Sequence, residues 1–243
     1  DRNGNVFAKS EKVYNVILDC VAVNGGDEEE QAKLKEQEID YIEPTIDALV
    51  KTLGLDEAEL RSLITDPATS GSRYQVLKKG ISLEEKQTFE DYTEIDSEKE
   101  YTKTDLARRR CVQGVWFEED YVRDYPLKTL ASNVIGVGSN SGGASGLESY
   151  YTDVLSGTDG REFGYLDENS DLQRTIVEPT NGNTIVSTLD INIQQVVEKY
   201  IAEFDAEYGK DAEDGKGAKS IGVIVGNPQN GEIYAMASNH GFD

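Results

Sequence analysis

Residues 184–201 read TIVSTLDINIQQVVEKYI and residues 221–243 read IGVIVGNPQNGEIYAMASNHGFD; together they predict a helix followed by a β-hairpin. Asp190 is a favourable helix N-cap, and Gly209 is a favourable stop. Between these two positions, apolar side chains recur at the spacing of one helix face, namely Ile193, Val196, Val197, Tyr200, Ile201 and Phe204. The segment therefore predicts an amphipathic helix.

The predicted hairpin follows an acidic loop that contains glycine. Its strands are the alternating apolar segments 221–225 and 233–237. The connection between them contains residues that favour turns, namely Asn227, Pro228, Asn230 and Gly231. A hairpin with one helix is marginally stable, and its outer edge presents unpaired backbone groups. We therefore expect these elements to open a larger domain that continues beyond Asp243.

Two short motifs in these segments are specific in their order and spacing. Thr188, Asp190 and Gln194 form the pattern TxD…Q at the start of the helix. The second strand carries the pattern GEIxAMAS, made by Gly231, Glu232, Ile233, Ala235, Met236, Ala237 and Ser238. In combination they resemble the opening of the transpeptidase domain of class B penicillin-binding proteins.

Upstream patches extend this resemblance over most of the chain. One follows DRNGxxLA, with Phe7 in place of the usual leucine, and consists of Asp1, Arg2, Asn3, Gly4 and Ala8. Another follows RxYP…A…G and consists of Arg123, Tyr125, Pro126, Ala131 and Gly136. A third resembles GxExxYxxxLxGxxG and consists of Gly146, Leu147, Glu148, Tyr151, Leu155, Gly157 and Gly160. The stretch from Cys20 to Cys111 carries little resemblance.

The resemblance implies an α+β fold in two parts. The first is an elongated, β-rich pedestal with a helical insertion. The second is the first helix and β-hairpin of an incomplete, penicillin-recognising transpeptidase domain. We expect the pedestal (dimerisation) domain to span residues 1–180, with the insertion at about 27–105, and the truncated transpeptidase part to span residues 181–243.

Local patterns predict the strands and loops of the pedestal. Apolar, β-like residues indicate strands within 6–23 and within 112–122, and a short strand or an extended arm at 74–77. The polar segment 92–104 predicts a mobile loop, and residues 147–155 predict a helix that Gly157 ends.

Helices are predicted between the first two strands and after the second. Asp56 is a favourable N-cap, and Ser82 forms a capping box with Glu85. A charged region after Gly26 contains an apolar stripe at helical spacing, and we expect Pro44 to kink or split this helix. The stripe consists of Leu34, Ile39, Ile42, Ile46, Leu49, Val50 and Leu53.

The charge of the chain excludes some partners. The 243 residues include 47 acidic and 24 basic side chains, which gives a formal charge of −23. This charge opposes binding to phosphate backbones and to anionic membrane surfaces, so nucleic acid is not expected as a partner. No apolar run approaches the roughly 20 residues that a membrane span needs. The resemblance implies an anchor just upstream of Asp1, and the membrane would be contacted only through that missing segment.

Neither a metal site nor a cofactor site is predicted. His240 is the sole histidine, and no paired cysteines accompany it, so a tetrahedral zinc site lacks ligands. The glycines between residues 136 and 146 lack the Lys-Ser/Thr pair of a phosphate-binding loop and favour a flexible connector. Cys20 and Cys111 each lie in a strand-like stretch, which favours buried free thiols and leaves a single disulfide possible.

The three upstream motif patches suggest a structural ion-pair cluster. Arg2 and Arg123 offer bidentate donors, and Glu148 offers a matching acceptor. Glu148 has no second carboxylate in a motif-like relation to it, so an acid–base role is disfavoured. Our hypothesis is that the three side chains meet and fix the amino-terminal strands beneath the transpeptidase domain.

No catalytic residue is predicted in this chain. Penicillin-binding transpeptidases use a serine followed by a lysine one helical turn later, together with an SxN pair and a KTG strand. No serine here has a lysine three positions on, and SxN and KTG are absent. The resemblance implies that the nucleophile lies downstream, so we expect this chain to be inactive alone.

The resemblance implies the function of the complete protein. It would be a D,D-transpeptidase that cross-links peptidoglycan stem peptides, binds β-lactams through the missing catalytic part, and lies on the extracytoplasmic face of the bacterial membrane. The pedestal would position the active site and contact proteins of cell-wall elongation or division. Two alternatives remain: a noncatalytic family member used for interaction or sensing, and an unrelated acidic, secreted binding domain.

Overall fold

The computed structural model describes residues 1–96, 99–139, 142–166, 172–209 and 217–241. The chain forms two compact units. One consists of residues 11–122, and the other combines residues 1–10 with residues 123–243. Part of the predicted polar loop at 92–104, part of the glycine cluster at 136–146 and the predicted acidic loop after Gly209 lie outside the described residues.

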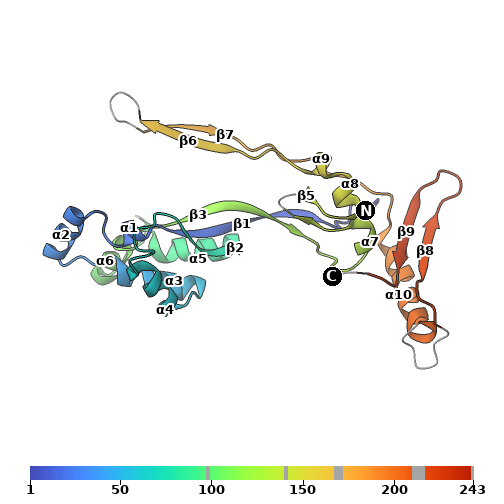
Figure 1. Cartoon of the computed structure of the whole chain (residues 1–243), viewed down its shortest axis with the longest axis horizontal. Helices are drawn as coiled ribbons and strands as arrows, with labels where there is room; N and C mark the ends of the chain where they lie inside the picture. The colour runs from blue at the N-terminus through green and yellow to red at the C-terminus, as the bar shows by residue number, and fades with distance from the viewer. Residues whose placement is uncertain (97–98, 140–141, 167–171, 210–216, 242–243) are drawn as a thin grey trace. The chain divides into compact units, whose positions relative to one another are not determined.

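The unit of residues 11–122 is built around a three-stranded sheet in the order β2-β1-β3 (Figure 1). The strands are β1 (Lys9–Leu18), β2 (Gln75–Ile81) and β3 (Val115–Asp124). β1 and β2 are antiparallel, with Tyr14 opposite Ile81 and Leu18 opposite Gln75. The strands predicted at 6–23, 74–77 and 112–122 are therefore present, and β2 extends four residues beyond the prediction.

Helices supply the remainder of the core of this unit. They include α3 (Ile42–Leu53), α4 (Glu57–Thr65) and α5 (Leu83–Thr93), which pack with the central strand (Figure 1). Asp56 caps α4, and the capping box of Ser82 and Glu85 starts α5, as predicted. Side chains with almost no exposure fill the interior, among them Val16, Leu18, Leu49, Ile64 and Ile81.

Two boundaries in this unit follow from local signals. Within the β-like stretch 6–23, β1 ends at Leu18, and Asp19 accepts a hydrogen bond from the Ala22 backbone N–H and starts a short helix, α1 (Cys20–Val23). The helical region after Gly26 is divided before Pro44, into α2 (Glu28–Glu36) and α3. Pro44 lies in the first turn of α3, where its missing N–H removes no helical hydrogen bond.

The two cysteines are free thiols outside the strands. Cys20 begins α1 and is buried, and Cys111 follows α6 (Lys103–Arg110) and is partly buried. Burial raises the pKa of the Cys20 thiol, and the nearby Asp19 carboxylate adds to this effect. Of the two possibilities left open by the sequence, the structure has the free thiols.

The second unit contains short elements around the middle motif patches. They are α7 (Ser132–Ile135), β4 (Gly138–Ser139), β5 (Gly142–Gly143), α8 (Gly146–Tyr150) and α9 (Thr152–Leu155). The helix predicted at 147–155 is thus interrupted at Tyr151, which is the C-cap of α8. A further antiparallel hairpin, β6 (Arg161–Leu166) with β7 (Leu172–Val177), was not predicted.

The helix and hairpin predicted at the end of the chain are confirmed. α10 (Ile191–Tyr208) has Asp190 as its N-cap and Gly209 as its C-cap. It packs against the antiparallel hairpin of β8 (Gly222–Gly226) and β9 (Ile233–Ser238) (Figure 1). None of the helices in the part of the chain that the structure describes has the length and apolar character that a membrane span requires.

Candidate functional site

The amino-terminal residues form a junction with the start of α10 and with β9. We call the segments 1–5, 188–198 and 232–236 the amino-terminal junction. The Arg2 backbone N–H donates to the Leu189 carbonyl oxygen at 2.9 Å. The Asp1 carboxylate accepts from the Asn5 backbone N–H at 2.7 Å and from the Ile191 backbone N–H at 3.3 Å. The DRNG patch is therefore folded onto the TxD patch.

Asp190 links the junction to the helix. Its carboxylate accepts from the backbone N–H groups of Asn192 and Ile193, and from the Asn3 side-chain amide at 3.0 Å. These hydrogen bonds, of which the one from Asn3 is the largest influence, lower the pKa of Asp190. Asp190 thus holds both the helix start and the amino-terminal turn through one charged group.

Arg2 does not join Glu148, which corrects the three-residue cluster expected from the sequence. Its Nη1 lies 3.2 Å from Glu232 Oε2, and its guanidinium lies over the Tyr234 ring at 4.5 Å from the centroid. A hydrogen bond from Asn230 is the largest influence that lowers the pKa of Glu232, and Arg2 contributes further. Arg2 therefore connects the DRNG patch with the GEI patch.

Arg123 and Glu148 do form the expected pair. Arg123 Nε and Nη2 donate to Glu148 Oε1 at 3.0 and 2.8 Å, and the Glu148 side chain is only 8% exposed. A Cβ atom at Gly138 would lie 2.7 Å from Glu148 Oε2, so a larger residue at position 138 would collide with the carboxylate. The Tyr125 hydroxyl accepts from the Gly138 backbone N–H at 2.6 Å. The pair is therefore enclosed by its own motif residues.

Gln194 is fully buried and occupies the edge of strand β9. Its Nε2 donates to the Met236 carbonyl oxygen at 2.9 Å, and the Met236 N–H donates to its Oε1 at 2.9 Å. Met236 lies opposite Ile224 in the hairpin, so these backbone groups point away from β8. The side-chain amide takes the place that a neighbouring strand would fill.

Two neighbouring contacts extend this closure of the β9 edge. The Asp190 backbone N–H donates to the Tyr234 carbonyl oxygen at 2.8 Å. The Thr188 hydroxyl donates to the Ile233 carbonyl oxygen at 2.8 Å. The TxD…Q motif is therefore a set of groups that pairs with one strand edge.

Glu198 belongs to this site and was missed by the sequence analysis. Its Oε1 accepts from Gln194 Nε2 at 2.8 Å and from the Ala131 backbone N–H at 2.7 Å. Its position four residues after Gln194, on the same helix face, is the signal that could have identified it. Ala131 has a φ of +58°, an uncommon conformation for a residue other than glycine.

A small apolar cluster lies beneath the junction. Its buried members come from the DRNG, RxYP…A…G and TxD patches, and they are Phe7, Ala131, Ile135 and Leu189. Tyr125, Leu147 and Ile191 pack against it. The DRNG, RxYP…A…G, GxExxYxxxLxGxxG and TxD patches therefore share one apolar cluster.

The remaining motif residues shape the backbone. Gly4, Gly146 and Gly231 all have positive φ angles. A Cβ at Gly146 would lie 2.5 Å from the Val134 carbonyl oxygen, so only glycine fits there. Pro126 directly follows Tyr125 at the end of β3. The structure brings the predicted residues together at the junction and at the Arg123–Glu148 pair.

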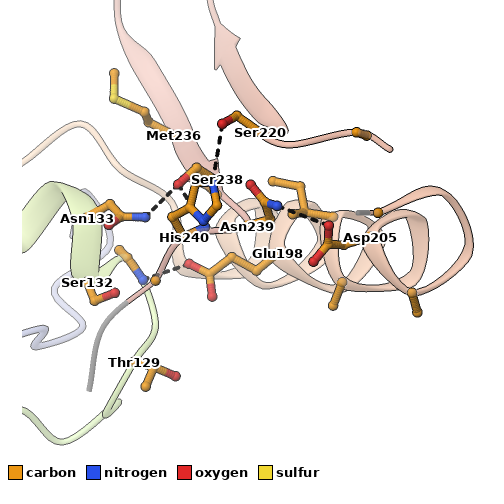
Figure 2. Close-up of a pocket in the computed structure, with 18 of the residues that line it drawn as sticks. Thr129, Ser132, Asn133, Glu198, Asp205, Ser220, Met236, Ser238, Asn239 and His240 are labelled. Carbon is orange, nitrogen blue, oxygen red and sulfur yellow. Dashed lines mark hydrogen bonds between the residues drawn. The ribbon is translucent and has the colours of Figure 1, made fainter. Parts of the chain in front are cut away.

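An open pocket of about 1120 Å³ lies beside α10 and the end of β9 (Figure 2). Ser220 Oγ lies 3.2 Å from His240 Nε2, which also lies 2.9 Å from the Lys219 carbonyl oxygen. A carbonyl oxygen only accepts, so the tautomer that hydrogen-bonds to Lys219 carries its proton on this ring nitrogen, which then cannot remove a proton from Ser220. In that tautomer the Ser220–His240 contact does not generate a nucleophile.

One known protein family matches most of this chain. Residues 1–187 match the family model described as the penicillin-binding protein dimerisation domain. The chain belongs to this family. The resemblance to class B penicillin-binding proteins is thereby confirmed.

Curated relatives are longer than this chain. Stage V sporulation protein D of Bacillus subtilis is 33% identical over 137 residues, which cover 54% of this chain and 20% of that protein. Peptidoglycan D,D-transpeptidase MrdA of Escherichia coli (strain K12) is 23% identical, and the match covers 100% of this chain and 35% of that protein. The chain thus spans about a fifth to a third of these relatives.

Solved structures share the fold. Penicillin-binding protein 2X from Streptococcus thermophilus matches with a TM-score of 0.66 at 22% identity, covering 100% of this chain and 34% of that chain. The complex between penicillin-binding protein PBP2 and MreC from Helicobacter pylori matches with a TM-score of 0.55 at 19% identity, covering 100% of this chain and 41% of that chain. Both likenesses concern the fold alone.

Proposed function

We propose that this chain is the supporting, non-catalytic portion of a class B penicillin-binding protein. Residues 1–180 form its pedestal, and residues 181–243 form the first helix and hairpin of its transpeptidase domain. The complete protein is a peptidoglycan D,D-transpeptidase that cross-links stem peptides outside the cytoplasmic membrane. The relative MrdA carries that activity in its name.

The observation that carries this proposal is the asymmetry of the β8–β9 hairpin. Gln194 and Asp190 close the outer edge of β9, whereas β8 has no strand neighbour other than β9 among the described residues, and its Ile224 side chain is 65% exposed. On α10, Val196, Tyr200 and Phe204 are about half exposed or more. One closed strand edge, one open strand edge and exposed apolar side chains together support a larger sheet, in which a further strand pairs with β8.

The role of the chain in this protein is support rather than chemistry. The sequence contains no SxxK, SxN or KTG motif, and in the tautomer that hydrogen-bonds to the Lys219 carbonyl oxygen His240 does not activate Ser220. One apolar cluster instead joins the DRNG, RxYP…A…G and TxD patches, and Arg2 links the DRNG patch to the GEI patch. We assign to these motif residues the task of fixing the transpeptidase domain on the pedestal.

The same proposal includes an interaction with partner proteins. The structural neighbour PBP2 was solved in a complex with MreC. We propose that this pedestal also contacts a protein of the cell-wall elongation or division machinery. Stem peptides and β-lactams are ligands of the catalytic part of the complete protein, which a membrane anchor holds at the extracytoplasmic face.

Labelling with a fluorescent penicillin tests the proposal. The complete gene product is incubated with the reagent, and the 243-residue chain serves as the matched control. Covalent labelling of the complete protein, with none of the shorter chain, is the expected result. A complete protein with the same fold but no labelling would indicate a noncatalytic family member. Labelling of the 243-residue chain would contradict the assignment of chemistry to another segment.

A further inference from the structure

A continuous set of hydrogen bonds joins the loop at Ala131 to strand β9 across helix α10. The Ala131 N–H donates to Glu198 Oε1, which also accepts from Gln194 Nε2. Gln194 in turn holds both backbone groups of Met236. In Figure 2 the Glu198 side chain extends from α10 toward Ser132, the residue that follows Ala131 in the sequence. We call these four residues the Glu198 relay.

The relay constrains each of its members. Gln194 has no exposed surface, and both ends of its amide are hydrogen-bonded, so it has no alternative partner in water. Ala131 is buried and keeps a left-handed backbone, a conformation that persists when surrounding contacts enforce it. Glu198 supplies one of these contacts.

The chemistry of the relay is specific to its side chains. Gln194 donates to two oxygens, those of Met236 and Glu198, while it accepts from one N–H. A glutamate at position 194 would replace the Nε2 donor with a carboxylate oxygen. This oxygen would face the Met236 carbonyl oxygen and the Glu198 carboxylate without donating to either. A glutamine at position 198 would keep one oxygen that can accept both hydrogen bonds.

We propose that Glu198 and Gln194 are positioning residues that transmit the placement of the Ala131 loop to strand β9, and through β9 to the reaction centre of the transpeptidase. This inference rests on the proposed function, because it assigns the relay a role in that reaction. Within the chain itself, the side chains of Glu198 and Gln194 couple the stability of the Ala131 loop to that of β9.

Hydrogen exchange on the 243-residue chain tests the coupling. We expect Glu198→Ala to accelerate exchange of the Met236 amide about tenfold, although the Met236 N–H donates to Gln194 and not to Glu198. Glu198→Gln should retain most of the protection. Glu203→Ala is the matched control, because Glu203 is exposed on the same helix and pairs only loosely with Lys199, at 3.7 Å. Unchanged exchange at Met236 in Glu198→Ala would overturn the relay.

Acylation of the complete protein tests the positioning role. The second-order rate constant for labelling by a fluorescent penicillin is measured below the unfolding temperature of every variant. We expect Gln194→Ala to reduce it about tenfold, and Gln195→Ala, an exposed neighbour, to leave it within about twofold. Absence of labelling in the wild type would overturn the proposed function. A labelled wild type with an equally fast Gln194→Ala variant would overturn the positioning role.

Discussion

Among the described residues, Glu148 is the one carboxylate that is buried. Its pairing with Arg123 compensates for the loss of hydration, and removing one partner leaves the other charge without compensation. The pair also brings together motif patches that are 25 positions apart in sequence. Its contribution should therefore be visible in the stability of its own unit.

We predict that Glu148→Ala lowers the free energy of unfolding by about 3 kcal/mol. Denaturant unfolding measures this change. The matched control is Glu119→Ala, because Glu119 also pairs with a cation, Lys12, but its side chain is 58% exposed. The control should have little effect, since exposed ion pairs contribute little to stability. Equal effects of the two substitutions would contradict the structural role of Glu148.

Asp190 gives a prediction for pH. Its pKa in the folded chain is lowered from 3.8, so the unfolded chain binds a proton more readily. Its contribution is complete well above pH 3.8 and is lost as the pH falls through the folded value. Asp190→Asn retains a capping oxygen but does not titrate. We expect the stability difference between wild type and Asp190→Asn to shrink on acidification, as followed by the exchange of α10 amides.

A pH-independent difference between these two proteins would contradict the assignment. The same measurement on Asp153→Asn provides a control, because Asp153 is an exposed acidic residue in the first turn of another helix. Any general effect of lost negative charge would appear in both variants.

Arginine side chains close the end of helix α5 at the scale of secondary-structure elements. Arg109 Nη1 donates to the carbonyl oxygens of Asp91 and Glu94, at 2.8 and 2.7 Å. The neighbouring Arg108 donates to the Tyr92 carbonyl oxygen at 3.0 Å. The Asp91 and Tyr92 carbonyl groups belong to the last turn of α5, where carbonyl groups lack intrahelical partners, and Glu94 is the C-cap, so α6 acts as the cap of α5.

We predict that Arg109→Ala weakens the local stability of this helix end by about 2 kcal/mol. Limited proteolysis and hydrogen exchange across residues 91–104 would detect the change. Arg110→Ala is the control, since Arg110 is exposed at the end of the same helix. If Arg109→Ala and Arg110→Ala were cleaved at the same rate and exchanged equally across residues 91–104, the capping role of Arg109 would be wrong.

Elements that depend on local signals were predictable, and those that depend on distant partners were not. α10 follows from a cap, a helical period and a terminating glycine, all within one segment. The strand predicted within 6–23 ends at Leu18, where the Asp19 side chain caps the short helix α1. The hairpin β6–β7 gave no clear alternating pattern or turn dipeptide, and was missed.

The candidate site shows the same limit. The motif residues were identified, yet Arg2 was assigned to Glu148 when its partner is Glu232. With 47 acidic side chains available, charge alone does not identify which carboxylate an arginine meets. Glu198 was missed because its partner, the Ala131 backbone N–H, has no side-chain signature.

The division into two compact units gives a prediction for the whole molecule. Leu49 is fully buried in the core of residues 11–122. Leu49→Ala should destabilise that unit by about 2–5 kcal/mol through lost burial and a cavity. Because the contacts of Leu49 lie within its own unit, hydrogen exchange should rise there and change little at α10 and β9. A uniform increase over the whole chain would indicate a single cooperative unit.

The open side of strand β8 has a practical consequence for anyone who purifies this chain. The edge of β8 opposite β9 has no strand partner among the described residues, and such an edge beside exposed apolar side chains such as Ile224 is a template for another copy. Purified samples should therefore self-associate as the concentration rises, despite the strong negative charge that favours solubility. A lysine at position 224 would place a charge at this edge and should keep the chain monomeric in sedimentation experiments.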